Sequence, residues 1–160
     1  MLVTPPPYSL LRMHYPDPFN VPAEELWQWI GHSEKILDSD WRNTCAIRMS
    51  LALLGAGFHF PTGFLKVKSG KYRGERLEIK QEVLANHLTS AWGEPEKFGA
   101  ALLRERIGDR RGVIRFIQLW GPYDPQGHID LLSHDEYHRL ACEGGHVYPH
   151  AVECWFWECP

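Results

Sequence analysis

The hydrophobic periodicity of this chain changes near residue 110, and this change most constrains the fold. Before it, apolar residues recur at a spacing of three to four, which predicts amphipathic helices. These helices are expected at 22–31, 43–56, 80–92 and 96–107. After it, apolar and polar residues alternate, which predicts strands at 112–120, 128–132 and 151–157. Helices followed by a run of strands favour an α+β fold with N-terminal helices packed on an antiparallel sheet.

The overall composition is that of an ordinary globular protein. The chain has 160 residues, 44% of them hydrophobic, so we expect one domain over residues 1–160. Residues 1–21 are rich in proline and predict an irregular arm laid over the body. The net charge of −3 argues against a broad nucleic-acid-binding surface, and no apolar run is long enough to enter a membrane. The N-terminus does not resemble a secretory signal peptide.

Cys45 lies at the expected start of the helix over 43–56, which Asn43 or Thr44 would cap. At that position the helix dipole and unpaired backbone N–H groups stabilise a thiolate, and the same N–H groups can bind an oxyanion. A buried structural cysteine is the alternative, because Ala46, Ile47 and Leu51 give this helix an apolar face.

His128 begins the strand after Gly127 and is the candidate base for Cys45. A cysteine at a helix start and a histidine on a later strand is the papain-type arrangement. Asp130 is two residues further along, so its side chain points to the same face of the strand and can orient the imidazole. Asp135, Glu136 and Glu143 in the following segment are alternatives for this third position.

The histidine-rich tail permits a different interpretation, a zinc-stabilised binding module. If residues 133–142 were helical, capped by Ser133, His134, His138 and Cys142 would line one face as zinc ligands. The spacing matches no zinc motif, and a solvated loop is the plainer interpretation, so we expect neither a metal nor a cofactor. Pairing among Cys142, Cys154 and Cys159 stays open.

Two further features have structural and functional interpretations. Tryptophans within the predicted elements fill the core or line a cleft, and aromatic walls also suit sugar-containing ligands. These are Trp27, Trp92, Trp120, Trp155 and Trp157. Arg48, one turn after Cys45, is either a buried ion-pair partner or a cleft residue that attracts a carboxylate.

Three segments resemble the family-four amidase effectors of type VI secretion. NTCAIRMSLAL (43–53), followed by GFHFP (57–61), is similar to the nucleophile helix of that family. GHIDLL (127–132) resembles its histidine motif, and AVECWFW (151–157) its last strand. The resemblance extends from about residue 22 to the end and does not cover the proline-rich arm.

The resemblance implies a papain-like, NlpC-type fold and a cysteine peptidase. Such an enzyme would cut the amide between γ-D-glutamate and meso-diaminopimelate in peptidoglycan stem peptides. It would be made in the bacterial cytoplasm, exported by the type VI machinery and active in the periplasm of the target cell. A cognate immunity protein would block the active site. A papain-like toxin acting on a protein, as a deamidase or transglutaminase, is the enzymatic alternative.

Carried over to this chain, the family pattern makes Cys45 the nucleophile and His128 the base. It places the third residue in the segment after the histidine strand, here 133–145, where no acid aligns cleanly. We therefore favour Asp130 for its geometry, with Asp135 next. The Cys45 amide and Asn43 are expected to bind the oxyanion, and cationic side chains to meet the substrate carboxylates. Arg42, Arg48 and Lys71 are the candidates for that contact.

Overall fold

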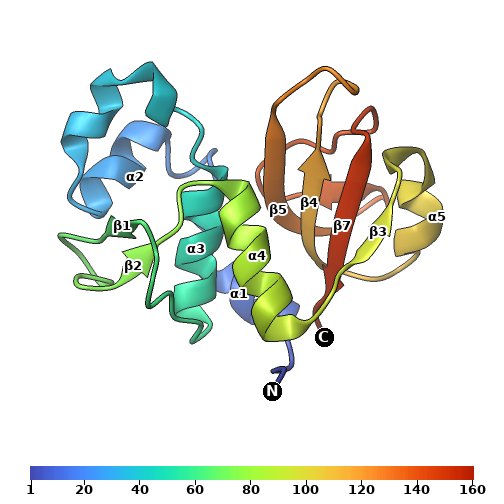
Figure 1. Cartoon of the computed structure of the whole chain (residues 1–160), viewed down its shortest axis with the longest axis horizontal. Helices are drawn as coiled ribbons and strands as arrows, with labels where there is room; N and C mark the ends of the chain where they lie inside the picture. The colour runs from blue at the N-terminus through green and yellow to red at the C-terminus, as the bar shows by residue number, and fades with distance from the viewer.

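Most of the helices lie in one half of the molecule and the large sheet in the other, with β1 and β2 beside the helices and α5 beside the sheet (Figure 1). The structure, a computed structural model, describes residues 1–160 except for the side chain of Asp40. The helices are α1 (Tyr8–His14), α2 (Ala23–Trp29), η1 (Ser33–Leu37), η2 (Ser39–Trp41), α3 (Cys45–Gly55), α4 (Gln81–Trp92), η3 (Ala100–Leu102) and α5 (Leu103–Ile107). The strands are β1 (Leu65–Lys66), β2 (Arg76–Leu77), β3 (Glu96–Phe98), β4 (Gly112–Ile117), β5 (Gly127–His134), β6 (Leu140–Cys142) and β7 (Glu153–Glu158).

Five strands form one sheet in the order β3-β7-β4-β5-β6, and every neighbouring pair is antiparallel. β1 and β2 form a separate two-stranded ladder. The predicted α+β class, with N-terminal helices packed on an antiparallel sheet, is confirmed. None of the helices in the described part of the chain is long and apolar enough to cross a bilayer.

Helix α3 lies at the centre of the helical half, and β5 is the strand of the large sheet that it contacts most (Figure 1). All of its residues from Cys45 to Leu54 are buried, because α1, α4 and the sheet surround it. The alternation of side chains along β5 explains why one face of this strand packs against the helices. Ile129 and Leu131 face the helical core, whereas His128 and Asp130 point to the opposite face of the strand.

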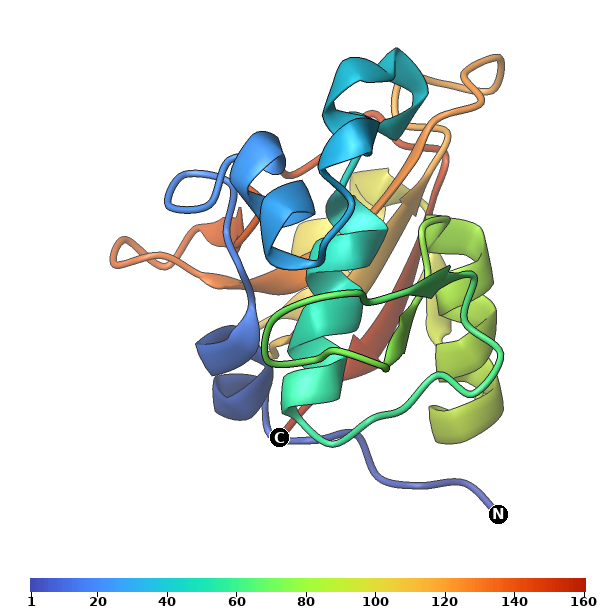
Figure 2. The same ribbon diagram turned by 90° about the vertical axis from the view of Figure 1, so that its left-hand side faces the viewer.

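The sequence predicted an irregular N-terminal arm, but part of this arm is helical. Residues Tyr8–His14 form α1, which packs beside α3 (Figure 2), and Tyr8 and Leu11 are buried there. Pro7 precedes the helix, where its fixed φ and missing N–H cost nothing. The Tyr8 amide donates to the Pro160 carbonyl at 2.8 Å, so this segment is joined to the chain end.

The predicted helix over 96–107 is wrong in its first part, and residues 133–142 are not the helix that the zinc interpretation requires, because strand pairing decides both segments. The segment 96–107 begins with β3, which pairs with the edge of β7, and only Leu103–Ile107 is α-helical. The segment 133–142 is a hairpin in which the end of β5 pairs with β6. The strand expected at 112–120 ends at Ile117, since Gln118 adopts a positive φ of 55°.

Candidate active site

Cys45 is the first residue of α3, and its side chain is 7% exposed. Its backbone N–H donates to Asn43 Oδ1 at 3.2 Å, so the exposed Asn43 side chain covers the first amide of the helix. Thr44, the residue between them, makes no side-chain capping bond to the helix. The thiol therefore lies where the helix dipole favours a negative charge.

His128 and Asp130 lie close together on β5, as their two-residue spacing predicts. His128 Nε2 is 2.8 Å from Asp130 Oδ2. The Asp130 side chain is fully buried, and that of His128 is 14% exposed. The carboxylate also accepts the Leu131 amide at 2.8 Å and the Gly144 amide at 3.0 Å. Three donors thus hold this buried carboxylate in one orientation.

The side chain of Cys45, at the start of α3, also interacts with the His128 imidazole. Nε2 bonds to Asp130, which leaves Nδ1 as the ring nitrogen available to the thiol. Burial alone would lower the pKa of His128, but the bonds to Asp130 and Cys45 and their negative charge outweigh it and raise this pKa to about 10. The site therefore favours the protonated form of His128.

Two tyrosines that the sequence did not single out complete the surroundings. The Tyr148 ring lies 5.3 Å from the His128 ring, centroid to centroid. Tyr15 is buried, and burial together with the neighbouring Asp130 carboxylate raises the pKa of its hydroxyl. Neither position carries a sequence signal, because Tyr15 follows α1 and Tyr148 belongs to a polar loop.

Arg48 is directed into the protein, in place of the substrate contact expected for it. It is 4% exposed, and its Nε donates to Thr44 Oγ1 at 2.9 Å. Its Nη1 donates to the carbonyls of Pro16 and Val21 at 2.8 and 2.7 Å. Arg48 therefore joins the segment after α1 to the start of α3.

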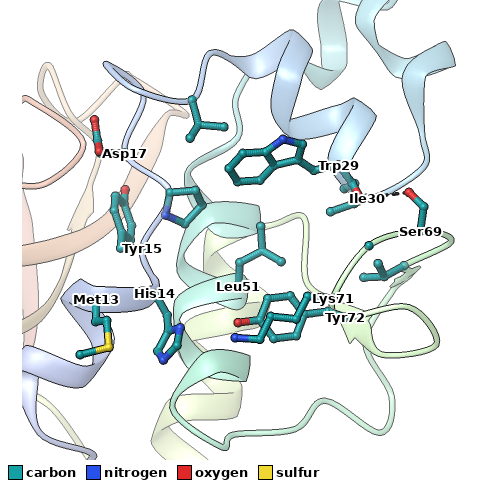
Figure 3. A pocket seen from close by; sticks show the side chains of 14 residues that line it. Met13, His14, Tyr15, Asp17, Trp29, Ile30, Leu51, Ser69, Lys71 and Tyr72 are labelled. Atoms are coloured by element: carbon teal, nitrogen blue, oxygen red, sulfur yellow. Dashed lines mark hydrogen bonds between the residues drawn. The ribbon is translucent and has the colours of Figure 1, made fainter.

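The other two cationic candidates have different surroundings. Arg42 is exposed, just before α3. Lys71 lines a cavity of about 560 Å³ between α1, α2, α3 and the loop joining β1 to β2. Figure 3 shows Trp29 from α2 and Lys71 from that loop on its wall. The residues that line this cavity do not include Cys45 or His128.

Asp135, the second candidate for the orienting acid, is occupied elsewhere. Its Oδ1 accepts the amides of Tyr137 and Arg139 at 2.8 and 2.9 Å, and its Oδ2 accepts Arg139 Nε at 2.8 Å. These bonds form the turn between β5 and β6. Glu143 instead pairs with Arg12 at 3.0 Å.

The tail does not assemble the zinc ligands of the rival interpretation. His134, His138 and Cys142 lie on a hairpin, so the helix that would align them is missing. Among the side chains that the structure describes, no group of three histidine, cysteine or acidic residues is placed to hold a metal ion. All four cysteines are free thiols, and burial raises the pKa of Cys154 and Cys159 to about 12.

Comparison with known proteins identifies the family of this chain. Residues 41–157 match the family model of the type VI secretion system amidase effector protein 4, Tae4. The crystal structure of Tae4 from Enterobacter cloacae superimposes with a TM-score of 0.79 at 18% identity, covering 100% of both chains. No curated protein matches the chain.

Two similar structures are complexes. The Tae4–Tai4 effector–immunity complex from Enterobacter cloacae matches with a TM-score of 0.72 at 19% identity, over 97% of this chain and 99% of that one. The Tae4–Tai4 complex from Salmonella Typhimurium matches with a TM-score of 0.69 at 21% identity, over 99% and 100%. These structures share the papain-like, NlpC-type fold, and the family model spans more than half of the chain. The chain therefore belongs to the type VI secretion system amidase effector 4 family.

Proposed function

We propose that this amidase effector is a cysteine peptidase that hydrolyses the amide between γ-D-glutamate and meso-diaminopimelate in peptidoglycan stem peptides. Cys45 is its nucleophile, His128 its general base and acid, and Asp130 the residue that orients His128. The proposal rests on one observation above all: Cys45 at a helix N-terminus interacts with His128, and His128 in turn is hydrogen bonded to the buried Asp130 carboxylate.

The reaction begins when His128 Nδ1 holds the thiol proton and the Cys45 sulfur attacks the scissile carbonyl carbon. The resulting tetrahedral oxyanion binds to the Cys45 amide, whose present acceptor is Asn43 Oδ1 at 3.2 Å. Substrate therefore replaces Asn43 as the acceptor, and rotation of this exposed side chain presents its NH₂ group to the same oxyanion. In the free enzyme Asn43 Oδ1 thus accepts the Cys45 amide. In the transition state the Asn43 NH₂ group donates to the oxyanion.

Collapse of the intermediate breaks the C–N bond. His128 gives its proton to the departing diaminopimelate amine, leaving an acyl-enzyme thioester. Neutral His128 then takes a proton from water, which attacks the thioester and regenerates the Cys45 thiol and a free γ-D-glutamate carboxylate. Throughout, the buried Asp130 carboxylate fixes the imidazole and stabilises its protonated form.

The setting of this activity follows from the family. Tae4 of Enterobacter cloacae and of Salmonella Typhimurium form complexes with the immunity protein Tai4. By analogy, this chain leaves the producing cell through the type VI machinery and acts in the periplasm of a rival cell. In the producing cell it binds a cognate immunity protein. Periplasmic expression is expected to lyse cells with the wild-type chain and to leave cells with the Cys45→Ala variant intact.

Purified sacculi test the proposed bond directly. The wild-type protein is expected to release fragments with a new γ-D-glutamate carboxylate and a new diaminopimelate amine, identified by mass spectrometry. Cys45→Ala is expected to lower the rate by a factor on the order of 10⁴ or more. Cys142→Ala, which removes a half-buried thiol outside the proposed catalytic residues, is the matched control and should stay within about threefold.

The same experiment separates the enzymatic alternative. A protein deamidase or transglutaminase would use the same three residues, because all these reactions pass through a thioester. Intact sacculi together with Cys45-dependent conversion of a protein glutamine would establish that alternative and overturn the proposal.

A further inference from the structure

An aromatic corner stands beside His128 and has no part in the proposed chemistry. We use this name for Trp120, Tyr148 and His150. The Trp120 and Tyr148 rings are 6.0 Å apart and nearly perpendicular, at 82°. The His150 ring is 6.5 Å from Trp120 and tilted by 31°. Trp120 is 66% exposed, so one large apolar face is open to a ligand.

The loop that carries Trp120 is held in place rather than free. Asp124 accepts the Trp120 amide with Oδ2 and the Gln126 amide with Oδ1, both at 3.0 Å. Two residues before Trp120, Gln118 has a positive φ of 55°, a backbone conformation that residues other than glycine seldom adopt. Such strain concentrates at sites that must present a group in a fixed position.

The corner is continuous with the catalytic residues through Tyr148. This ring packs on the buried Phe116 at 5.4 Å and reaches His128 at 5.3 Å. Trp120 therefore lies two ring contacts from the imidazole. A group bound against Trp120 can belong to the same substrate molecule whose amide lies at Cys45.

We propose that the aromatic corner binds a sugar ring of the glycan strand that carries the stem peptide. The enzyme would then prefer glycan-linked stems to free peptides. A pyranose has apolar C–H faces and polar edges, which suit an exposed indole with the Tyr148 ring and the His150 imidazole beside it. This inference rests on the proposed function, because it adds a second contact to the same substrate.

The spacing in the substrate agrees with this placement. Between the scissile amide and the muramic acid ring lie γ-D-glutamate, L-alanine and a lactyl group, which span on the order of 10 Å when extended. The ring contacts of 5.3 and 6.0 Å from His128 to Tyr148 and on to Trp120 cover a comparable reach. A short peptide alone would leave the Trp120 face empty.

Trp29 offers a matched control for Trp120. It is 48% exposed, so it also presents an indole to solvent, but it lines the cavity of Figure 3. That cavity includes neither Cys45 nor His128. Replacing Trp29 by alanine removes the same side chain without touching the aromatic corner.

The test compares two substrates that share one scissile bond, the free stem tetrapeptide and the same peptide attached to its disaccharide. Wild type is expected to show a higher kcat/KM for the disaccharide-linked peptide. Trp120→Ala is expected to lower this preference about tenfold, and Trp29→Ala to leave it unchanged. Equal kcat/KM for both substrates in wild type, or an unchanged preference in Trp120→Ala, would overturn the inference.

A binding measurement makes the test independent of turnover. Cys45→Ala, titrated with an oligomer of N-acetylglucosamine that has no peptide, should show a saturable shift of the Trp120 indole N–H signal by NMR. Absence of that shift at millimolar sugar would count against the corner as a sugar site. If wild type cleaves neither peptide substrate, it is the proposed reaction that fails, whereas cleavage of both without preference rejects the sugar contact alone.

Discussion

Asp130 and Asp135 are five residues apart, and each was a candidate for the residue that orients His128. Asp130 is fully buried and accepts the His128 imidazole and two backbone amides. Asp135 lies in the turn after the same strand, and its oxygens accept hydrogen bonds from Tyr137 and Arg139. Both carboxylates are well hydrogen bonded, so hydrogen bonding alone does not distinguish a catalytic acid from a structural one.

The difference lies in which neighbour shares the carboxylate. At Asp130 the neighbour is a histidine that also interacts with a thiol, and the carboxylate itself is a buried negative charge. At Asp135 the neighbour is an exposed arginine, and the pair closes a hairpin. Burial strengthens the first interaction, whereas solvent screens the second.

The strongest way to break this comparison is to remove each carboxylate in turn. Asp130→Ala is expected to lower kcat on stem peptides by about 10³–10⁴-fold, because the imidazole loses its orientation and its countercharge. Asp135→Ala should stay within about twofold. Asp130→Asn keeps an acceptor and should recover at least about tenfold over the alanine variant. Equal activities of the two alanine variants would refute the assignment.

Gly144 offers a smaller, steric test of the same site. A Cβ at this position would lie 2.3 Å from Asp130 Oδ2, so Gly144→Ala must displace the carboxylate. We expect an activity loss of about 10–100-fold and a destabilisation of about 1–3 kcal/mol. Gly99→Ala is the control, because the nearest atom to its Cβ would be 3.7 Å away. Kinetics and thermal unfolding of both variants decide.

The raised pKa of His128 makes stability depend on pH. Its pKa is about 10 in the folded state, against 6.5 for an ordinary histidine, so the folded state holds the proton more tightly. The resulting stabilisation is complete below pH 6.5 and is lost as the pH rises through 10. The unfolding free energy of wild type minus that of His128→Gln should therefore fall by roughly 1–3 kcal/mol from pH 6 to 10.

His134 lies at the other end of the same strand and is the control for that measurement. His134→Gln should follow the wild-type pH profile. A pH-independent difference between wild type and His128→Gln would contradict the imidazolium at His128.

The smallest expected effect concerns the structural role of Asp135. Asp135→Ala should lower Tm by no more than about 4 °C, because an exposed turn contributes little to global stability. Amide exchange of Tyr137 and Arg139 should increase, since both amides donate to this carboxylate. Unchanged exchange at these two amides would show that the turn does not depend on Asp135.

The sequence predicted the α3 helix, the β4–β5 hairpin and the side-chain direction of Asp130, because each depends on repeating geometry within a few residues. It failed where distant partners decide. Residues 96–98 form strand β3 because they pair with the edge of β7. Part of the arm forms α1 because Leu11 is buried where this helix packs beside α3. For Arg48 the sequence left a cleft role open beside the favoured structural one, and the carbonyls of Pro16 and Val21, which accept its guanidinium, decide for the structural role.

By itself, then, the sequence determined the α+β class, a cysteine at a helix start, a histidine with an aspartate on one strand face, and the family. These follow from the periods of helix and strand and from short strings of residues. Only the tertiary structure brought the start of α3 to β5, separated Asp130 from Asp135 by burial, and placed Tyr148 beside His128 and Trp120 beside Tyr148. Such contacts join residues far apart in the chain, and the packing of the whole core decides which of them form.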